Sequence, residues 1–278
     1  MGTTTTTQDF LGLTADGDGV HRLTMAEHLL GGGSGSLFGG VGVAAAMIAV
    51  EAMTGQPTVY MTCQFASTVT PPAELVFTPE LLAQGRTVTQ ARITGTSGDR
   101  TILALVGATG NRTEDHRGMW QSMPDAPPPE ELEPLKRMGE TTSLHDHVDI
   151  RMARGAFGFA PEDALGRGTP SGDASTLIWL RMPRVGHDSA AMAILADYLP
   201  SAVGNAVGTQ VFCSSLDNIV RIAGPFEDDP TSEWILGESH IEFVGDGFAS
   251  TRGFLWSRDG KLLASANQSV TVAKPRPV

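Results

Sequence analysis

The chain has 278 residues, of which 41% are hydrophobic and 18% charged, and its formal net charge is −12. This composition is typical of a soluble globular protein with one large domain or two of ordinary size. The acidic balance and the lack of any Lys/Arg cluster argue against a nucleic-acid partner, because affinity there depends on neutralising phosphates. The longest apolar stretch, Val41–Val50, is too short to span a membrane, and the Thr-rich start (Met1–Gln8) lacks the features of a signal peptide. We therefore expect a cytoplasmic protein without a membrane partner.

The first predicted element is a buried helix. The sequence Leu37-Phe38-Gly39-Gly40 precedes Val41–Met53, a segment of Ala, Val, Met and Ile whose first polar side chain is Glu51. A helix that is apolar nearly all round is buried, and Gly55 and Pro57 end it. Short connections between the β-type runs that follow predict an antiparallel sheet around this helix. These runs are Thr58–Ser67, Glu74–Gln84, Val88–Thr96 and Thr101–Gly110.

A proline-rich and glutamate-rich segment, Asn111–Leu135, is predicted to be a linker. After it, the order of a helix followed by strands returns, with the helical segment at Ser189–Leu199. We therefore predict one α+β unit at 9–110, a linker at 111–142 and a second unit at 143–275. Gly155–Ala174, rich in Gly, Pro and Asp, is predicted to be a long surface loop. The β-type runs of the second unit are Leu144–Ala153, Thr176–Met182, Gln210–Ile222, Glu233–Val244, Ala249–Ser257 and Leu262–Ala273.

The two units look like copies of one another. An offset of 160 positions places Gly85–Ala108 on Gly245–Gln268, with six identities in 24 positions. Both segments carry turn residues between two β-type runs, as a hairpin requires. The offset matches Ala108 with Gln268, so the second copy holds a polar side chain that the first copy lacks. This asymmetry predicts one working site, in the second copy.

Short motifs in both halves give the chain its resemblance to a known family. In chain order they are Leu37-Phe38-Gly39-Gly40, Gly85-Arg86, Ala196-Asp197-Tyr198, Ser215-Leu216-Asp217, Asp259-Gly260-Lys261-Leu262 and Ala264-Ser265-Ala266-Asn267-Gln268. Their order and spacing resemble the acyl-CoA thioesterase II (TesB-like) family over roughly Asp9 to Ala273. The resemblance implies a tandem (double) hotdog fold, in which each half is an antiparallel sheet wrapped around a central buried helix.

The same resemblance implies a hydrolase that releases free acid and CoA from an acyl-CoA. It implies that Asp197, Ser215 and Gln268 hold and activate a water molecule, with no cofactor beyond the CoA of the substrate and with assembly into homo-oligomers. Thioester hydrolysis needs a general base, and burial raises the pKa of a carboxylate such as Asp197 towards a useful value. Ser215 and Gln268 both donate and accept hydrogen bonds, which suits them to orienting a water.

Further expectations concern the surroundings of this trio. Backbone N–H groups near Gly39-Gly40 are candidates to stabilise the oxyanion. In the first copy, Tyr60 by strand position takes the place of Ser215, and glycines around Gly40 take that of Asp197. Asp217 is expected to bind backbone beneath the site. Two departures from the family, Asn218 after the "LD" pair and Ser269 after the Gln, lie beside the trio.

Several other interpretations remain to be weighed. A non-catalytic acyl-CoA-binding protein is motivated by these two departures, and an enoyl-CoA hydratase would need a His that follows Asp197 closely. The pair His145-x-His147 is read as part of a surface strand rather than a metal site. The pattern Gly40-x-Gly42-x-x-Ala45 lacks the preceding strand of a dinucleotide fingerprint. Cys63 and Cys213 are expected to be buried thiols rather than a disulfide.

Overall fold

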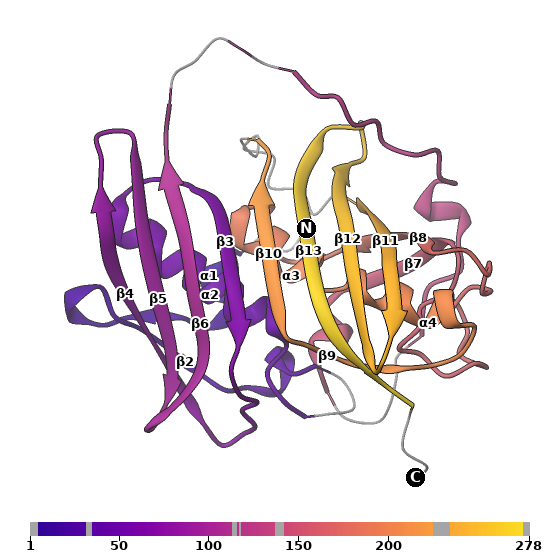
Figure 1. Cartoon of the computed structure of the whole chain (residues 1–278), viewed down its shortest axis with the longest axis horizontal. Helices are drawn as coiled ribbons and strands as arrows, with labels where there is room; N and C mark the ends of the chain where they lie inside the picture. Colours follow the sequence, from indigo (N-terminus) through magenta and orange to yellow (C-terminus); the bar gives the residue numbers. More distant parts are fainter. Residues whose placement is uncertain are drawn as a thin grey trace.

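One antiparallel sheet curves around two central helices in the computed structural model, which describes residues 5–31, 35–112, 116, 118–136, 142–224 and 234–274. The strand order is β1-β2-β4-β5-β6-β3-β10-β13-β12-β11-β8-β7, and β9 pairs with β13. The two halves join where β3 pairs with β10, so the described part of the chain forms one continuous sheet (Figure 1). This arrangement confirms the predicted double hotdog fold.

The elements of each half follow the predicted order. The first half contains α1 (Thr7–Leu11), β1 (Thr14–Ala15), β2 (His21–Thr24), α2 (Gly39–Thr54), β3 (Thr58–Phe65), β4 (Glu74–Gln84), β5 (Val88–Ser97) and β6 (Arg100–Gly110). The second half contains β7 (Asp149–Arg154), β8 (Ser175–Arg181), α3 (Ser189–Ala196), α4 (Ala202–Val207), β9 (Phe212–Ser215), β10 (Asp217–Ile222), β11 (Ile235–Gly245), β12 (Phe248–Ser257) and β13 (Leu262–Ala273).

The central helices α2 and α3 are buried because their side chains are apolar on every face. They pack against each other behind β3 and β10 (Figure 1). The second helix is shorter than predicted, because Pro200 interrupts the helical run and a 3₁₀ turn at Leu199–Ser201 separates α3 from α4. By length and composition the stretch Ser189–Val207 resembles a membrane span, but 89% of its most apolar window is buried inside the fold.

Two segments predicted to be loose are packed. Phe157 and Ala160 are completely buried, and Gly158 lies so close to Gly204 that a Cβ on either would collide with the other's backbone. The prediction of a surface loop at Gly155–Ala174 is therefore wrong for its first part, where small residues let the segment approach the core, whereas most residues after Ala160 are exposed as predicted. In the linker, the Pro127 carbonyl accepts a hydrogen bond from the Trp179 ring, so the segment around Pro127 lies against the second half.

Irregularities in the strands identify which residues of the two copies are equivalent. The β-bulge at Leu81/Ala83 in β4 recurs at Ile241/Phe243 in β11, and the bulge at Gly95/Thr96 recurs at Leu255/Trp256, both 160 positions later. Across each hairpin, however, Gly95 pairs with Leu103 whereas Leu255 pairs with Ala264, which lies 161 positions later. The second hairpin has one residue more in its turn, so a constant offset fails beyond it.

The corrected alignment changes the first-copy counterparts of the predicted site. Gln268 corresponds to Gly107 rather than Ala108, and both lie on the buried face of their strand. Gly107 pairs with Met61, and the register of β10 with β13 places Asn218 opposite Gln268, so Met61 corresponds to Asn218.

The same procedure corrects the other two counterparts. Ser215 pairs with Val270 as Thr58 pairs with Thr109, so Thr58, not Tyr60, corresponds to Ser215. Counted from the N-caps Phe38 and Asp188, the counterpart of Asp197 is Met47 rather than a glycine. The second copy therefore carries Asp, Asn and Gln where the first carries Met, Met and Gly.

Candidate functional site

Asp197 lies where the end of α3 meets the beginning of α2. It is the C-cap residue of α3, and 7% of it is exposed. The two helices approach closely because Gly40 has no side chain. A Cβ there would lie 2.8 Å from the Ala193 carbonyl oxygen and 2.9 Å from the Asp197 Cβ. The glycine pair of the first half thus brings a helix N-terminus to the acid of the second half.

The Asp197 carboxylate accepts three hydrogen bonds from three different elements. The Gly40 backbone N–H donates to Oδ2 at 2.7 Å, the Gln268 side-chain amide donates to Oδ1 at 2.8 Å, and the Asn218 amide donates to the same Oδ1 at 3.3 Å. A carboxylate has about four lone-pair positions. Three are occupied, which leaves room for one further donor.

Ser215 is connected to Asp197 through Gln268. Its hydroxyl donates to the Gln268 Oε1 at 3.4 Å, while the Gln268 Nε2 donates to Asp197. The carboxylate only accepts hydrogen bonds, so it fixes the Gln268 amide with its Nε2 towards Asp197, and the Ser215 hydroxyl then donates to the remaining Oε1. The structure brings the three predicted residues together in the order Ser215, Gln268, Asp197. The predicted contact of Asp217 is confirmed, since its Oδ1 accepts the Ser269 backbone N–H at 2.6 Å.

The surroundings of Asp197 set its protonation. Burial raises the pKa of Asp197 to about 6, and the hydrogen bonds from Gly40, Gln268 and Asn218 partly oppose that rise. A buried carboxylate without these donors would hold its proton more strongly still. Asp197 is therefore ionised near neutral pH and has the proton affinity that a general base needs.

Asn218 is the site residue that sequence reasoning missed. It was treated as a departure from a motif, yet its side chain is completely buried and bonded to Asp197. The strand pattern of the sequence could have indicated it, because Asn218 lies two positions before the apolar Val220 and therefore on the same, inward face of its strand. A polar residue on the buried face of a strand needs a partner.

The expectation for the helix N-terminus needs revision. The Gly40 N–H is already bonded to the Asp197 carboxylate, so it contributes to holding the base. A role for this N–H in stabilising an oxyanion would require it to leave Asp197. The positive end of α2 nevertheless stabilises the ionised form of the acid.

An aromatic cluster packs beside this site. The Tyr198 hydroxyl lies 2.9 Å from His145 Nδ1, and the Phe38 ring lies 5.1 Å from the ring of Tyr198. Burial lowers the pKa of His145 to about 4, so this imidazole is neutral at physiological pH. The prediction that His145-x-His147 forms a surface strand is wrong, because both residues lie in a 3₁₀ turn at Leu144–His147 and His145 packs against Tyr198. Among the described residues, no group of three His, Cys, Asp or Glu side chains is placed to hold a metal ion.

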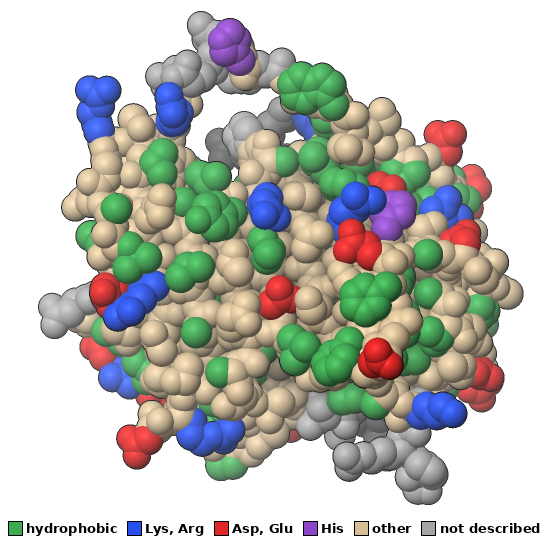
Figure 2. Space-filling view, in the orientation of Figure 1, with side chains coloured by type: hydrophobic (Ala, Val, Ile, Leu, Met, Phe, Trp, Pro, Cys, Tyr) green, Lys and Arg blue, Asp and Glu red, His purple; other side chains and the backbone are tan. Residues whose placement is uncertain are grey.

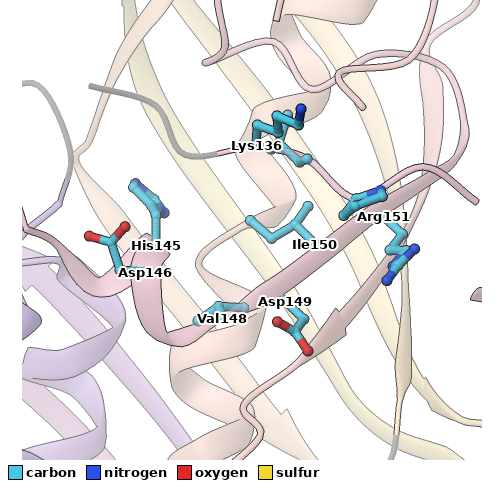
Figure 3. A pocket seen from close by; sticks show the side chains of 9 residues that line it. Lys136, His145, Asp146, Val148, Asp149, Ile150 and Arg151 are labelled. Carbon is cyan, nitrogen blue, oxygen red and sulfur yellow. The ribbon is translucent and has the colours of Figure 1, made fainter. Parts of the chain in front are cut away.

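An open cleft lies on the other side of His145 (Figure 3). Its charged side chains have both signs, and Asp149 is paired with Arg181 in a salt bridge. The residues that line it are Pro134, Leu135, Lys136, His145, Asp146, Val148, Asp149, Ile150 and Arg151. None of the predicted trio is among them, and one lining residue, His145, contacts Tyr198, the chain neighbour of Asp197.

Neither cysteine is suited to nucleophilic attack. Cys63 is buried and Cys213 half-buried, and both are free. Burial raises the pKa of the Cys63 thiol strongly and that of Cys213 to about 12. A thiol that keeps its proton is a poor nucleophile.

Comparisons with known proteins bear on the family of the chain. A sequence model of the acyl-CoA thioesterase C-terminal domain matches residues 123–272. No curated protein matches the chain. A proposed thioesterase from Novosphingobium aromaticivorans DSM 12444 is 29% identical, with a TM-score of 0.79, covering 93% of this chain and 97% of that one.

Two further solved structures show the same fold. A conserved protein of unknown function with a hot dog fold from Alicyclobacillus acidocaldarius has 21% identity and a TM-score of 0.82, covering 97% of this chain and 98% of that one. The acyl-CoA thioesterase II TesB2 from Mycobacterium marinum has 18% identity and a TM-score of 0.71, with the same coverage. The chain therefore belongs to the acyl-CoA thioesterase II (TesB-like) family of thioester hydrolases, as its double hotdog architecture and the matched domain both show.

Proposed function

We propose that this protein hydrolyses the thioester of an acyl-CoA to a free acid and CoA, using a water molecule activated at Asp197. The observation that carries the proposal is the state of the Asp197 carboxylate. It is buried, holds a pKa of about 6, and has three N–H donors that leave one lone-pair position for a water.

The reaction proceeds by general-base catalysis. Asp197 takes a proton from the water as its oxygen attacks the thioester carbonyl carbon. The tetrahedral intermediate then collapses, the C–S bond breaks, and the departing thiolate receives the proton from Asp197. Gln268 holds the carboxylate in place, and Ser215 holds Gln268. No cofactor takes part in these steps.

Product analysis tests this function against its alternatives. The protein is incubated with saturated and 2-enoyl acyl-CoAs, and free acid, free CoA and hydrated CoA ester are separated by chromatography. We expect acid and CoA in equal amounts. A hydrated ester with the CoA still attached would indicate a hydratase, and bound acyl-CoA without products would indicate a binding protein. Either of these results would contradict the proposal.

The pH dependence follows from the pKa of Asp197. The base must be ionised to accept a proton, and its folded-state pKa is about 6. The value of kcat/KM is therefore expected to rise about tenfold for each unit between about pH 4 and 6 and to level off above about pH 7. Initial rates of thiol release in buffers of constant ionic strength measure this profile. A rate that does not change between about pH 5 and 8 would exclude Asp197 as the base.

Removing the Gln268 amide should weaken catalysis by Asp197, while the Asp197 carboxylate itself remains. Gln268→Leu deletes the donor to Asp197 and the acceptor of Ser215, so we expect kcat to fall roughly 10²-fold. The loss of a donor that lowers the Asp197 pKa should also move the ascending pH limb upward. Asn267→Leu, one residue earlier and facing the other side of β13, is the matched control and should retain activity. Equal rates for the two variants would contradict this role of Gln268.

Association between copies of the chain is a further expectation. Large hydrophobic side chains are exposed on strands of both halves, among them Val59, Val106, Phe243 and Phe248. Figure 2 shows hydrophobic side chains distributed over the strand face of the molecule, with an acidic side chain near its centre and further charged side chains among them. Contiguous exposed apolar surface marks association sites. Light scattering of the purified protein measures the resulting mass directly.

A further inference from the structure

The side-chain oxygen of Asn218 is a buried hydrogen-bond acceptor for which the described residues provide no donor. Its side chain is completely buried, and its Oδ1 has no hydrogen-bond partner among the described residues. A buried acceptor without a donor costs about 1–3 kcal/mol, and such groups in native proteins are normally paired with protein or water. The Oδ1 therefore calls for a donor from outside the described part of the chain.

The orientation of the amide is determined by its neighbour. The Asn218 Nδ2 faces Asp197 Oδ1 at 3.3 Å. The reversed amide would place an acceptor against a carboxylate oxygen, which also only accepts. The Oδ1 is therefore fixed as an acceptor, on the same side chain that touches the base.

A small donor that satisfies both groups is water. Asp197 has about one lone-pair position left after its three donors, and Asn218 Oδ1 offers another. A water that donates one hydrogen to each acceptor has both hydrogens engaged. The lone pairs of the water oxygen then point away from both side chains and are free to attack the thioester carbonyl carbon.

We propose that Asn218 is a catalytic residue that binds the attacking water, accepting one of its hydrogens while Asp197 accepts the hydrogen that is transferred. This inference rests on the proposed hydrolysis. It assigns to Asn218 a role distinct from that of Gln268, which uses its Nε2 on Asp197 and its Oε1 on Ser215. Only the Asn218 amide keeps its oxygen available.

The comparison between the two copies agrees with this assignment. The counterpart of Asn218 in the first half is Met61, which lies opposite Gly107, the counterpart of Gln268. The corresponding position for Asp197 is Met47. In this chain the half that lacks the acid therefore also carries an apolar residue at the Asn218 position, so the amide occurs together with the acid.

The test separates binding of the water from support of the base. Asn218→Leu keeps the size of the side chain and removes both its donor and its acceptor. If the water is held by Oδ1, the plateau of kcat at high pH should fall roughly 10²-fold, while KM stays within about twofold. Gln268→Leu is the reference, because it also removes a donor to Asp197 but leaves the Asn218 Oδ1 in place. If Asn218 only donates to Asp197, over its longer distance of 3.3 Å, the pH limb moves upward and the plateau kcat falls less than in Gln268→Leu. The second result would overturn the proposal.

A second variant covers the case in which Asn218→Leu does not fold, and a second readout does not require the protein to be active. Should Asn218→Leu not fold, Asn218→Met places the first copy's residue in the same position and serves in its place. A high-resolution crystal structure of the wild type should show an ordered water within hydrogen-bond distance of both Asn218 Oδ1 and Asp197, and the variant should lack it. This readout stands even if the wild type hydrolyses no acyl-CoA, in which case the proposed function alone fails. The absence of a water at Asn218 Oδ1 would overturn the inference.

Discussion

Asp197→Asn is expected to lower kcat for thioester hydrolysis by about 10²–10⁴-fold, the usual contribution of a general base. Asparagine has nearly the same shape but does not accept the proton of the attacking water. Its single carbonyl oxygen also replaces two carboxylate oxygens that together accept from Gly40, Gln268 and Asn218. The variant should therefore retain substrate binding and lose turnover, which steady-state thiol release measures as a fall in kcat at similar KM.

The matched control for this variant is an acid on the other central helix. Glu51, near the end of α2, accepts from the Thr58 backbone N–H and from the Ser189 hydroxyl through one oxygen, Oε1. Glu51→Gln keeps an oxygen for both donors, so its activity should stay within about twofold of the wild type. Circular dichroism and thermal unfolding of both variants establish that they fold. Full activity in a folded Asp197→Asn protein would show that another group is the base.

Gly40→Ala is expected to be destabilising by about 3 kcal/mol, the upper part of the range for overpacking a buried site. The added Cβ would lie 2.8 Å from both the Ala193 carbonyl oxygen and the Ile194 Cα, and 2.9 Å from the Asp197 Cβ. Two of these atoms belong to the backbone of α3, so the helices have to separate. Separation also lengthens the 2.7 Å hydrogen bond from Gly40 to Asp197, and turnover should fall with stability.

Gly245→Ala supplies the control for this effect. An added Cβ at Gly245, on β11, would meet no atom within 4 Å. The free energy of unfolding of this variant should therefore lie within about 0.5 kcal/mol of that of the wild type. Urea unfolding followed by tryptophan fluorescence gives both free energies. If Gly40→Ala unfolded at the same urea concentration as the wild type, the close approach of α2 and α3 would not be required.

The sequence was sufficient to predict the fold because its signals are local. The segment from Val41 to Met53 is apolar on every face, which only a buried helix satisfies. Ser97–Arg100 and Ser257–Gly260 carry turn residues, and each joins two paired strands as predicted. Asp197, Ser215 and Gln268 were identified by their resemblance to a family pattern, and the structure places them in one hydrogen-bonded chain.

The remaining features depend on contacts that local patterns do not encode. Gly40 and Asp197 lie 157 positions apart, and the hydrogen bond that joins them exists only because two helices pack. The first-half counterpart of Gln268 is Gly107 rather than Ala108 because one extra residue in the second hairpin shifts the register after it. The role of Asn218 follows from its place on the inward face of β10, beside Asp197, and a family motif does not encode that face.

The most direct test of the account is the rate of CoA release by the wild-type protein from a panel of acyl-CoAs, short to long and branched, at about pH 8, where Asp197 is ionised. The account predicts catalytic release of CoA from at least one member, with many turnovers per protein molecule and a clear preference among the chains. Binding of acyl-CoAs, detected as a rise in the unfolding temperature, without release from any of them would contradict it.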